Sequence, residues 1–531
     1  MNRLVPAALV LSAAAAAAQD PCEGNGLGEV YLQTTPAIIG QGLTIDLGSP
    51  ALPGGIGLLA YSLGFGPVTL PAPFGTLCLN VLSPTFTLDA HTLDGSGNKH
   101  LDIPLPNNPA FFGSPPLHAS AWTLNGPTLE IAKTVPIYLE WPDSFSPTAD
   151  LAFGRSMHRA TALGQDGKDN RIQVLVSGGG NGTIFKPQST ATTEIFQPLN
   201  RTFLAGPNMG QPRAYHSATL LEDGRVLIAG GMNAAGICTT TAEIYDHATG
   251  AFTPTGSMGS PRAAHTATRL DDGRVLVTGG LADYQNADSQ LAAVLSTAQN
   301  TAEVFDPSTG TWTAVANAMT SKRSGHAAML EPDGRVLIIS GINGGVPTGV
   351  GTDVPTFTPT CDRYDPTTNT FTIATSIPIG RAFHGASRLA SGDVLVTGGL
   401  ITAGPFGEAL ATSTCYRLSG GAWTQVGSLP IGVAFHSQVE LDDGTAFISG
   451  GYLGDFVTLV ASANSGVHDG TTYTAKAQVG TNVGLPAVQP SPRGAHTMTK
   501  LWDGSMLLLG GFHSPDTSTI LVKDDGFVVR P

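Results

Sequence analysis

Charged residues are scarce in this sequence, and basic residues are the scarcer kind. Only 12% of the 531 residues are charged, and 26 lysines and arginines stand against 40 aspartates and glutamates, a formal net charge of −14. Proteins bind nucleic acids and anionic membrane surfaces mainly through clusters of lysine and arginine. The charge balance therefore argues against both as partners.

Long helical periods are missing, and so are long apolar segments beyond the N-terminus. The Ala-rich stretch from Leu4 to Ala18 follows Arg3 and precedes Gln19-Asp20. It is too short to span a bilayer, and no second apolar segment of about 20 residues follows. We interpret residues 1–18 as a secretory signal peptide, which predicts a secreted protein (extracellular, cell-surface or periplasmic) without a membrane span.

Glycine, by contrast, is abundant, with 67 residues, and many of them belong to a repeat. Each copy has an arginine three residues before a histidine, a small-residue run, an acidic-Gly turn, an apolar run and a Gly-Gly pair. A clear copy runs from Arg213-Ala-Tyr215-His216 to Gly230-Gly231. The anchoring histidines are spaced by 49 to 61 residues and are His158, His216, His265, His326, His384, His436 and His496. Self-similarity at such a period indicates a fold built from repeated units.

One unit predicts a small antiparallel sheet. Residues 217–220 and 226–229 are joined by Glu222-Asp223-Gly224, and Asp-Gly between two such runs is typical of a hairpin. A third run covers residues 242–245, and turns such as Asp306-Pro-Ser-Thr-Gly310 lead to a fourth. We expect the fourth run to begin at an aromatic residue: Phe203, Phe252, Trp312, Phe371, Trp423, Tyr473 or Phe527. Radial stacking of such sheets would bury faces that one sheet alone cannot.

These repeats resemble the kelch-repeat β-propeller family, in the long-repeat style of bacterial galactose-oxidase-like proteins. The resemblance covers roughly residues 150–531 and implies an all-β fold with a seven-bladed kelch-type propeller over residues 146–531, six or eight blades being the alternatives. Departures are few: Ser340-Gly341 replaces one Gly-Gly, and Val433 replaces the arginine of the sixth unit. The seventh unit is expected to close on residues 520–522 and 527–529.

Residues 19–145 lack the repeat. Strand-like runs cover residues 30–32, 43–46, 56–63, 77–79, 86–88, 101–103, 117–124 and 136–139. This spacing predicts a small β-sandwich of immunoglobulin-like size in front of the propeller. We interpret residues 140–147 as the linker.

Five cysteines fit an oxidising compartment only in part. Cys22 and Cys78 could form one disulfide in the N-terminal region. Cys361 and Cys415 share one register in neighbouring units, where equivalent atoms lie beyond the roughly 7 Å limit for a disulfide, so we predict small buried residues. Cys238 lies in a loop without an obvious partner.

The repeated histidines and arginines allow a structural and a functional interpretation. Seven histidines could form a metal cluster, but hydrogen bonds inside each blade would recur equally, and we favour the latter. Acids in the third run, Glu194, Glu243, Glu303 and Asp362, predict ion pairs with the first four arginines. Arg381 and Arg493 lack such an acid in our register, which makes them candidates for ligand contact. His468 and His513 are isolated and are expected at the surface.

The resemblance also raises copper radical oxidases, which use a Tyr-His pair resembling Tyr215-His216, a second tyrosine, a further histidine and a cysteine. The residues before the other repeat histidines are Met157, Ala264, Gly325, Phe383, Phe435 and Ala495. None is a tyrosine, and no cysteine stands at a repeat start. We therefore assign no catalytic residue, no cofactor and no metal ligand, and a metal in the central channel stays an open alternative.

The long connections after Gly-Gly, residues 281–300, 344–360 and 400–413, should emerge on the same face as the Arg-x-x-His starts. With Tyr215 they offer Tyr284, Phe357 and Phe406 for contact with a ligand. We predict a binding or interaction module for a carbohydrate or protein ligand. The alternative is a carbohydrate-active or oxidase-type enzyme on this face, for which Asp283, Asp353 and Glu408 are the loop acids to check.

Overall fold

A computed structural model describes residues 144–531 except 164–172, 184–185, 199–200, 286, 288–289, 348–352, 404–407, 455–459, 477–491, 502–503, 514–520 and 531. Between residues 31 and 140 it describes only the backbone of the strands. The chain divides into two compact units, Met1–Ser144 and Phe145–Pro531. Each is described by itself.

The first unit contains strands throughout its described part. They are β1 (Tyr31–Thr34), β2 (Ala37–Ile38), β3 (Leu43–Gly48), β4 (Ile56–Ser62), β5 (Phe65–Thr69), β6 (Thr76–Leu79), β7 (Thr87–Thr92), β8 (Asn98–Ile103), β9 (Leu117–Asn125), β10 (Thr128–Ile131), β11 (Val135–Ile137) and β12 (Leu139–Glu140). Two larger sheets have the orders β1-β3-β8 and β10-β9-β4-β7, with β11 added to β9. Every predicted run overlaps a strand, whereas the sandwich itself and the Cys22–Cys78 disulfide, whose side chains lie outside the described residues, stay predictions.

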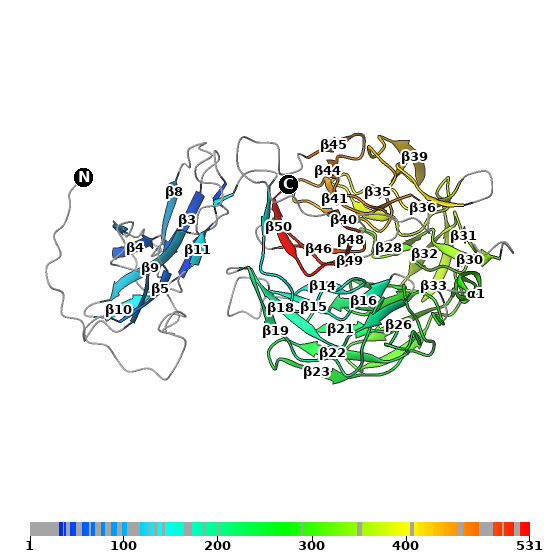
Figure 1. The fold of residues 1–531 in the computed structure, drawn as a ribbon, viewed down its shortest axis with the longest axis horizontal. Coiled ribbons are helices and arrows are strands. Elements are labelled where there is room, and N and C mark those ends of the chain that lie inside the picture. Colours follow the sequence, from blue (N-terminus) through cyan, green and yellow to red (C-terminus); the bar gives the residue numbers. More distant parts are fainter. Residues whose placement is uncertain are drawn as a thin grey trace. The chain divides into compact units, whose positions relative to one another are not determined.

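The second unit consists of seven four-stranded sheets (Figure 1). The first three are β14 (Arg159–Ala162), β15 (Val174–Ser177), β18 (Thr193–Gln197) and β19 (Thr202–Ala205); β20 (Ser217–Leu220), β21 (Val226–Ala229), β22 (Ala242–Asp246) and β23 (Ala251–Pro254); and β24 (Thr266–Arg269), β25 (Val275–Thr278), β26 (Ala302–Asp306) and β27 (Thr311–Ala314). The next three are β28 (Ala327–Leu330), β29 (Val336–Ile339), β32 (Cys361–Asp365) and β33 (Thr370–Ala374); β34 (Gly385–Arg388), β35 (Val394–Thr397), β38 (Cys415–Ser419) and β39 (Ala422–Val426); and β40 (Ser437–Glu440), β41 (Ala446–Ser449), β44 (Ser465–His468) and β45 (Tyr473–Ala475). Neighbouring strands within these sheets are antiparallel, as the hairpin signals predict.

The seventh sheet draws on both ends of this unit. Its strands are β46 (Thr497–Lys500), β47 (Met506–Leu509), β50 (Gly526–Arg530) and, at the outer edge, β13 (Ser144–Pro147). Two sequence interpretations were wrong here. Phe527 lies in the third strand and does not begin the fourth, and residues 144–147 are a strand of the propeller and not part of a linker.

Contacts between neighbouring inner strands close the ring of blades. β14, β20, β24, β28, β34, β40 and β46 contact one another in this order, and β46 contacts β14. At each junction the second glycine of Gly-Gly donates its N–H to the carbonyl oxygen of the residue at the arginine position of the next blade. Gly231 donates to Arg262 at 2.7 Å, and Gly511 closes the circle on Arg155 at 2.9 Å. The blade count is therefore seven.

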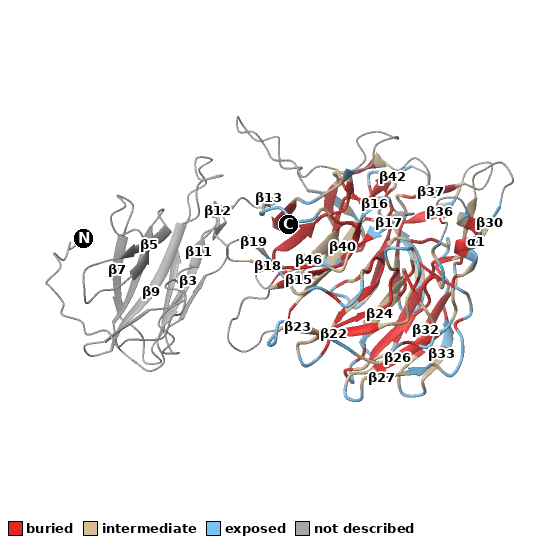
Figure 2. Cartoon of the chain, turned by 60° about the horizontal axis from the view of Figure 1, so that its bottom comes forward, coloured by how far each residue is buried: buried red, intermediate tan, exposed pale blue. Residues whose placement is uncertain are grey.

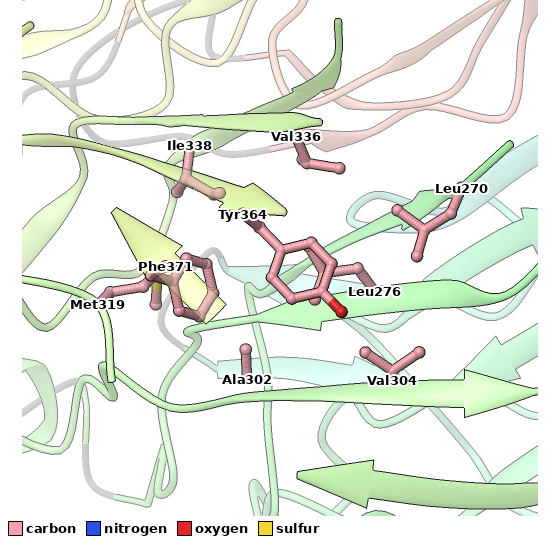
Figure 3. Packing of buried hydrophobic residues seen from close by; sticks show 9 residues of the cluster. All are labelled: Leu270, Leu276, Ala302, Val304, Met319, Val336, Ile338, Tyr364 and Phe371. Carbon is pink, nitrogen blue, oxygen red and sulfur yellow. The ribbon is translucent and has the colours of Figure 1, made fainter. Parts of the chain in front are cut away.

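The core lies between the blades. Figure 2 shows buried residues along the strands of the sheets. One junction, between the third and fourth blades, gathers nine buried side chains, shown in Figure 3: Leu270, Leu276, Ala302, Val304, Met319, Val336, Ile338, Tyr364 and Phe371. Aromatic side chains also pair across the third and fourth strands, as Tyr364 and Phe371 do with ring centroids 5.5 Å apart. In the sixth blade His468 takes this position and is fully buried, so the surface placement predicted for it was wrong.

Short elements follow several of the Gly-Gly pairs. Five are two-stranded ribbons: β16 (Gly180–Thr183) with β17 (Lys186–Ser189), β30 (Ile342–Val346) with β31 (Val354–Phe357), β36 (Leu400–Thr402) with β37 (Ala409–Ala411), β42 (Tyr452–Leu453) with β43 (Val460–Ala461), and β48 (Phe512–His513) with β49 (Leu521–Val522). The connection in the third blade contains a six-residue helix, α1 (Leu291–Ser296). Within the described part of the chain, no helix has the length and apolarity needed to cross a bilayer.

Candidate functional site

The repeat starts and the connections after Gly-Gly share one face of the propeller, as the sequence predicts. In every blade the residue after the arginine position forms an antiparallel bridge with the residue after Gly-Gly. The seven bridges are Ser156–Gly180, Ala214–Met232, Ala263–Leu281, Ser324–Ile342, Ala382–Leu400, Ala434–Tyr452 and Gly494–Phe512. We call this side the loop face, and the side with the Asp-Gly turns the hairpin face.

A ring of seven left-handed residues lies on the loop face. It consists of the residue before each repeat histidine: Met157, Tyr215, Ala264, Gly325, Phe383, Phe435 and Ala495, all with φ between 53° and 58°. Successive members are linked by backbone hydrogen bonds from N–H to carbonyl oxygen, of which six join Met157 through to Ala495 at 2.8 to 3.1 Å. We call it the axial ring. Bulky residues seldom adopt a positive φ, and such strain is concentrated at functional sites.

Two phenylalanines of the axial ring stack on each other. The rings of Phe383 and Phe435 lie 4.0 Å apart between centroids with an interplanar angle of 17°. Phe383 also covers Gly325, where an added Cβ would lie 2.7 Å from a carbon of the Phe383 ring. Both phenylalanines are half-buried, so each keeps an accessible surface. The glycine in the fourth blade thus makes room for a stacked aromatic pair.

Two tyrosines form a second aromatic group. The Tyr284 hydroxyl donates to the Tyr215 oxygen at 3.4 Å, and the ring centroids lie 5.4 Å apart. Burial, with a smaller contribution from Tyr284, raises the pKa of Tyr215 well above its ordinary value. Cys238 lies in the same apolar cluster, and burial raises its pKa to about 12. The loop that carries Tyr284 therefore supplies a second tyrosine that a comparison of repeat starts could not find.

The remaining predicted loop residues are placed as follows. Phe357 is half-buried beside Phe383 and the first residue of α1, Leu291, whereas Phe406 lies outside the described residues. Asp353 accepts the N–H of Ala292 at 2.7 Å and so caps α1, and Asp283 accepts the N–H of Gln285. These two acids stabilise their loops. No three His, Cys, Asp or Glu side chains in the described part of the chain are arranged to hold a metal ion.

The repeat arginines are structural. Arg155, Arg213, Arg262 and Arg323 pair with Glu194, Glu243, Glu303 and Asp362, as predicted. The acid also holds the segment that enters the blade, as Glu243 does by accepting the N–H of Gly210 at 2.7 Å. Each pair therefore ties the repeat start, just before the first strand of a blade, to the third strand of that blade.

Arg381 and Arg493 are also buried inside their blades, not exposed at a surface where a ligand would contact them. Arg381 donates to the carbonyl oxygens of Gly398 and Thr414, and its guanidinium lies 4.9 Å from the centroid of the Tyr416 ring. Arg493 has an acidic partner that our register missed, Asp525, at 2.9 Å. The premise for their ligand role, a missing partner and an available guanidinium, therefore fails.

Five of the seven repeat histidines are hydrogen-bonded through Nε2 to a hydroxyl group of the preceding blade, which corrects the prediction of bonds inside each blade. Nε2 of His265 lies 3.0 Å from the hydroxyl oxygen of Ser217 in the preceding blade. In the same way, Nε2 of His436 lies 2.9 Å from the hydroxyl oxygen of Thr397 in the blade before it. Burial is the main cause of their lowered pKa values, about 3 for His265 and about 4 for His436. Neutral imidazoles packed between blades serve as structural links.

The side chains around Tyr215 do not fit the copper radical site that the resemblance raised. His216 is fully buried, and its Nε2 is hydrogen-bonded to the Ser177 hydroxyl at 3.0 Å, so it faces the blade junction. No member of the axial ring is a histidine that could serve as a second ligand. Tyr215, Tyr284 and Cys238 are close together, but the imidazoles needed beside them are engaged elsewhere.

Comparisons with known proteins agree with this architecture. The Kelch motif family model matches residues 262–319, which cover the four strands of the third blade. No curated protein matches the chain. Among solved structures the chain is similar to a fungal alcohol oxidase of the AA5 family in complex with copper, with 16% identity over 73% of this chain and 76% of that one and a TM-score of 0.53. It also matches a structure described as that of YjhT, with 16% identity over 62% of this chain and 99% of that one and a TM-score of 0.47.

At 16% identity the likeness to the oxidase concerns the fold alone. The repeated Arg-x-x-His and Gly-Gly motifs, the closed circle of seven four-stranded blades and the Kelch motif match all describe the same architecture. Residues 145–531 are a kelch-repeat β-propeller.

Proposed function

We propose that this protein binds carbohydrate through the axial ring and the loop residues beside it. A kelch propeller is in general suited to a binding or interaction module. The observation that carries the carbohydrate assignment is the stacked, half-buried pair Phe383 and Phe435 on a ring without a charged side chain. Binding sites for small ligands combine apolar and aromatic walls with a few placed polar groups.

Polar groups of the required kind lie on the same face. Tyr284 is half-buried and Tyr215 is buried beside it, and because burial raises pKa values that already lie well above 7, both phenol groups are protonated at neutral pH. They can therefore donate and accept hydrogen bonds, as sugar hydroxyls require. Because no carboxylate or cation belongs to the axial ring, a neutral sugar suits this surface better than a charged one.

We further propose that binding takes place outside the cytoplasm, on the strength of the predicted signal peptide over residues 1–18. N-terminal sequencing of protein recovered from the culture medium or the periplasm tests this directly. A mature chain that begins near Gln19 supports export, whereas a chain retained in the cytoplasm with residues 1–18 contradicts it.

A glycan-array screen of the mature protein tests the carbohydrate assignment. For a glycan that binds, we expect Phe383→Ala and Phe435→Ala each to weaken the affinity about tenfold, because each removes one face of the stacked pair. Tyr215→Phe should weaken it less, since it removes only one hydroxyl group. Ile373→Ala is the matched control, because this side chain is 78% exposed on β33, a fourth strand away from the axial ring.

Two outcomes would overturn the assignment. One is the absence of saturable binding to any glycan, and the other is binding that the phenylalanine variants leave unchanged. Elemental analysis of the same sample distinguishes carbohydrate binding from the oxidase-type enzyme that is the alternative. Stoichiometric copper would show that the histidines rearrange to bind a metal, and oxidase activity would then be the preferred function.

A further inference from the structure

One charged side chain breaks the repeat at the start of an inner strand. The residue after each repeat histidine is the first residue of the inner strand, and six of the seven are uncharged: Ser217, Thr266, Ala327, Gly385, Ser437 and Thr497. The seventh is Arg159, in β14. Since all seven positions share one structural role, a blade can evidently form without a charge here.

The Arg159 guanidinium reaches from β14 to the next inner strand. Its Nε donates to the carbonyl oxygen of His216 at 2.8 Å. Among the described residues, the bond from Nε to His216 is the one hydrogen bond of the Arg159 side chain. The two Nη atoms have no hydrogen-bond or ion-pair partner there. Arg159 also disfavours the charged forms of His158, His216 and His265, which lie in three successive blades. The side chain therefore lies along the inside of the ring of inner strands.

Arg159 combines two properties that rarely occur together. The inner strands surround it closely enough for burial to lower its pKa, yet the residue is exposed to solvent. Solvent must therefore reach it inside the ring. Arg155, four residues earlier, is fully buried and pairs with Glu194 at 2.6 Å, whereas no described carboxylate lies within ion-pair distance of Arg159.

Arg159 is a solvent-reached cation without a described carboxylate partner, and a guanidinium presents its N–H groups as a fork that matches carboxylates and oxyanions. We propose that Arg159 binds an anion, either a small oxyanion or a carboxylate group, on the inner side of the propeller ring. The two Nη groups would donate to the oxygens of the anion while Nε stays bonded to His216. This site is separate from the axial ring and does not depend on carbohydrate binding.

Isothermal titration of the full-length mature protein with sulfate, phosphate and acetate, each at constant ionic strength, tests this site. We expect one saturable site for at least one anion, and at least about tenfold weaker binding to Arg159→Gln, which keeps an N–H donor but loses the charge. Preference for acetate over sulfate would identify a carboxylate site, and the reverse would identify an oxyanion site. Arg269→Gln is the matched control, because Arg269 is an exposed arginine at the last position of another inner strand, β24.

A second measurement covers the case in which Arg159→Gln does not fold. Crystals of the wild-type protein soaked in selenate should show an anomalous peak beside the Nη atoms of Arg159. The proposal is overturned if the wild-type protein shows no saturable binding up to about 100 mM anion, since a site that weak would add almost nothing to stability. Equal binding by the wild-type protein and a folded Arg159→Gln variant would also overturn it.

Discussion

At the scale of single residues, five of the seven repeat histidines are hydrogen-bonded to a hydroxyl group in the preceding blade, and His384 and His496 are the exceptions among the described residues. Two positions can supply the hydroxyl group: the first residue of the inner strand, as Ser217 does for His265, or the last residue of the second strand, as Thr397 does for His436. The fourth blade has Ala327 and Ile339 at these positions. Accordingly, neither ring nitrogen of His384 has a hydrogen-bond partner in the described part of the chain.

Ala327→Ser should therefore stabilise the protein. The new hydroxyl would take the position that Ser217 has opposite His265, and a buried polar atom that gains its missing partner is worth about 1 kcal/mol. Ser217→Ala should cost about 1–2 kcal/mol, because it leaves His265 without its partner. Urea unfolding of both variants, with Ala328→Ser as the neighbouring control, measures the two effects. Equal changes for Ala327→Ser and the control would contradict this account.

The same histidines predict a loss of stability in mild acid. Burial lowers the pKa of His265, His384 and His496 to about 3, below the value of about 6.5 expected in the unfolded chain. Between these values the unfolded state binds more protons than the folded state. Stability is therefore complete above pH 6.5 and falls by up to about 1.4 kcal/mol per histidine for each pH unit below it.

Unfolding by urea at pH 7, 6, 5 and 4.5 measures this dependence. A free energy of unfolding that stays constant from pH 7 to 5 would show that these imidazoles are not held neutral. The slope of the free energy of unfolding against pH reports the number of protons taken up on unfolding. His265→Gln should lower this number by about one, whatever its effect on the stability at pH 7.

The sequence indicated part of the candidate site and missed the rest for identifiable reasons. Tyr215, Tyr284 and Phe357 were predicted from their positions on the loop face. Phe383 and Phe435 were passed over as repeat-start residues, although bulky side chains where Ala264 and Gly325 are small were a visible signal. Asp525 was missed because it takes the place that a threonine has in other blades, whereas Phe527 occupies the register of the acid.

At the scale of elements, hairpins and strand bounds could be predicted closely because turn chemistry and apolar runs are local. Residues 217–220 and 226–229 are strands β20 and β21 without adjustment. Bonds between blades could not be predicted in this way. A periodic histidine is compatible with a partner in its own blade or in the preceding one, and only the packing of the blades decides between them.

The two kinds of glycine within a blade should respond differently to substitution. Gly230, at the blade junction, and Gly224, in the Asp-Gly turn, both have a positive φ, 62° and 85°. A Cβ at Gly230 would lie 2.5 Å from the carbonyl oxygen of Arg262, whereas nothing lies within 4 Å of one at Gly224. Gly224→Ala should cost about 1–2 kcal/mol of backbone strain, and Gly230→Ala clearly more, since the blades must also separate.

Thermal unfolding of Gly230→Ala and Gly224→Ala compares these costs directly. Because the backbone strain is similar in both, the difference between the variants measures the contact between blades. Equal losses of stability would mean that the junction adjusts freely to an added Cβ. The close approach of Gly-Gly to the next blade would then contribute nothing to the stability of the propeller.

At the scale of the whole molecule, the propeller closes with a strand from the other end of its own sequence. β13, residues 144–147, is the outer strand of the seventh sheet, beside β50 near the C-terminus. The N–H of Thr148 donates to Gly526 and that of Leu151 to Asp524, so the segment after β13 follows the same edge. The sequence alone did not indicate this pairing, because residues 144–147 have no repeat signal and their partner lies nearly 400 residues away.

Removal of β13 should therefore weaken the propeller. A chain that begins at residue 148 would leave the edge of β50 unpaired, whereas one that begins at residue 141 keeps β13 and lacks the same upstream strands. Each backbone hydrogen bond lost from the β13–β50 pair is worth about 1 kcal/mol, so we expect a loss on the order of a few kcal/mol. An exposed strand edge should also promote association. Urea unfolding and light scattering of the two chains measure both effects, and identical behaviour would mean that the circle of seven inner strands holds the propeller closed without its outer strand.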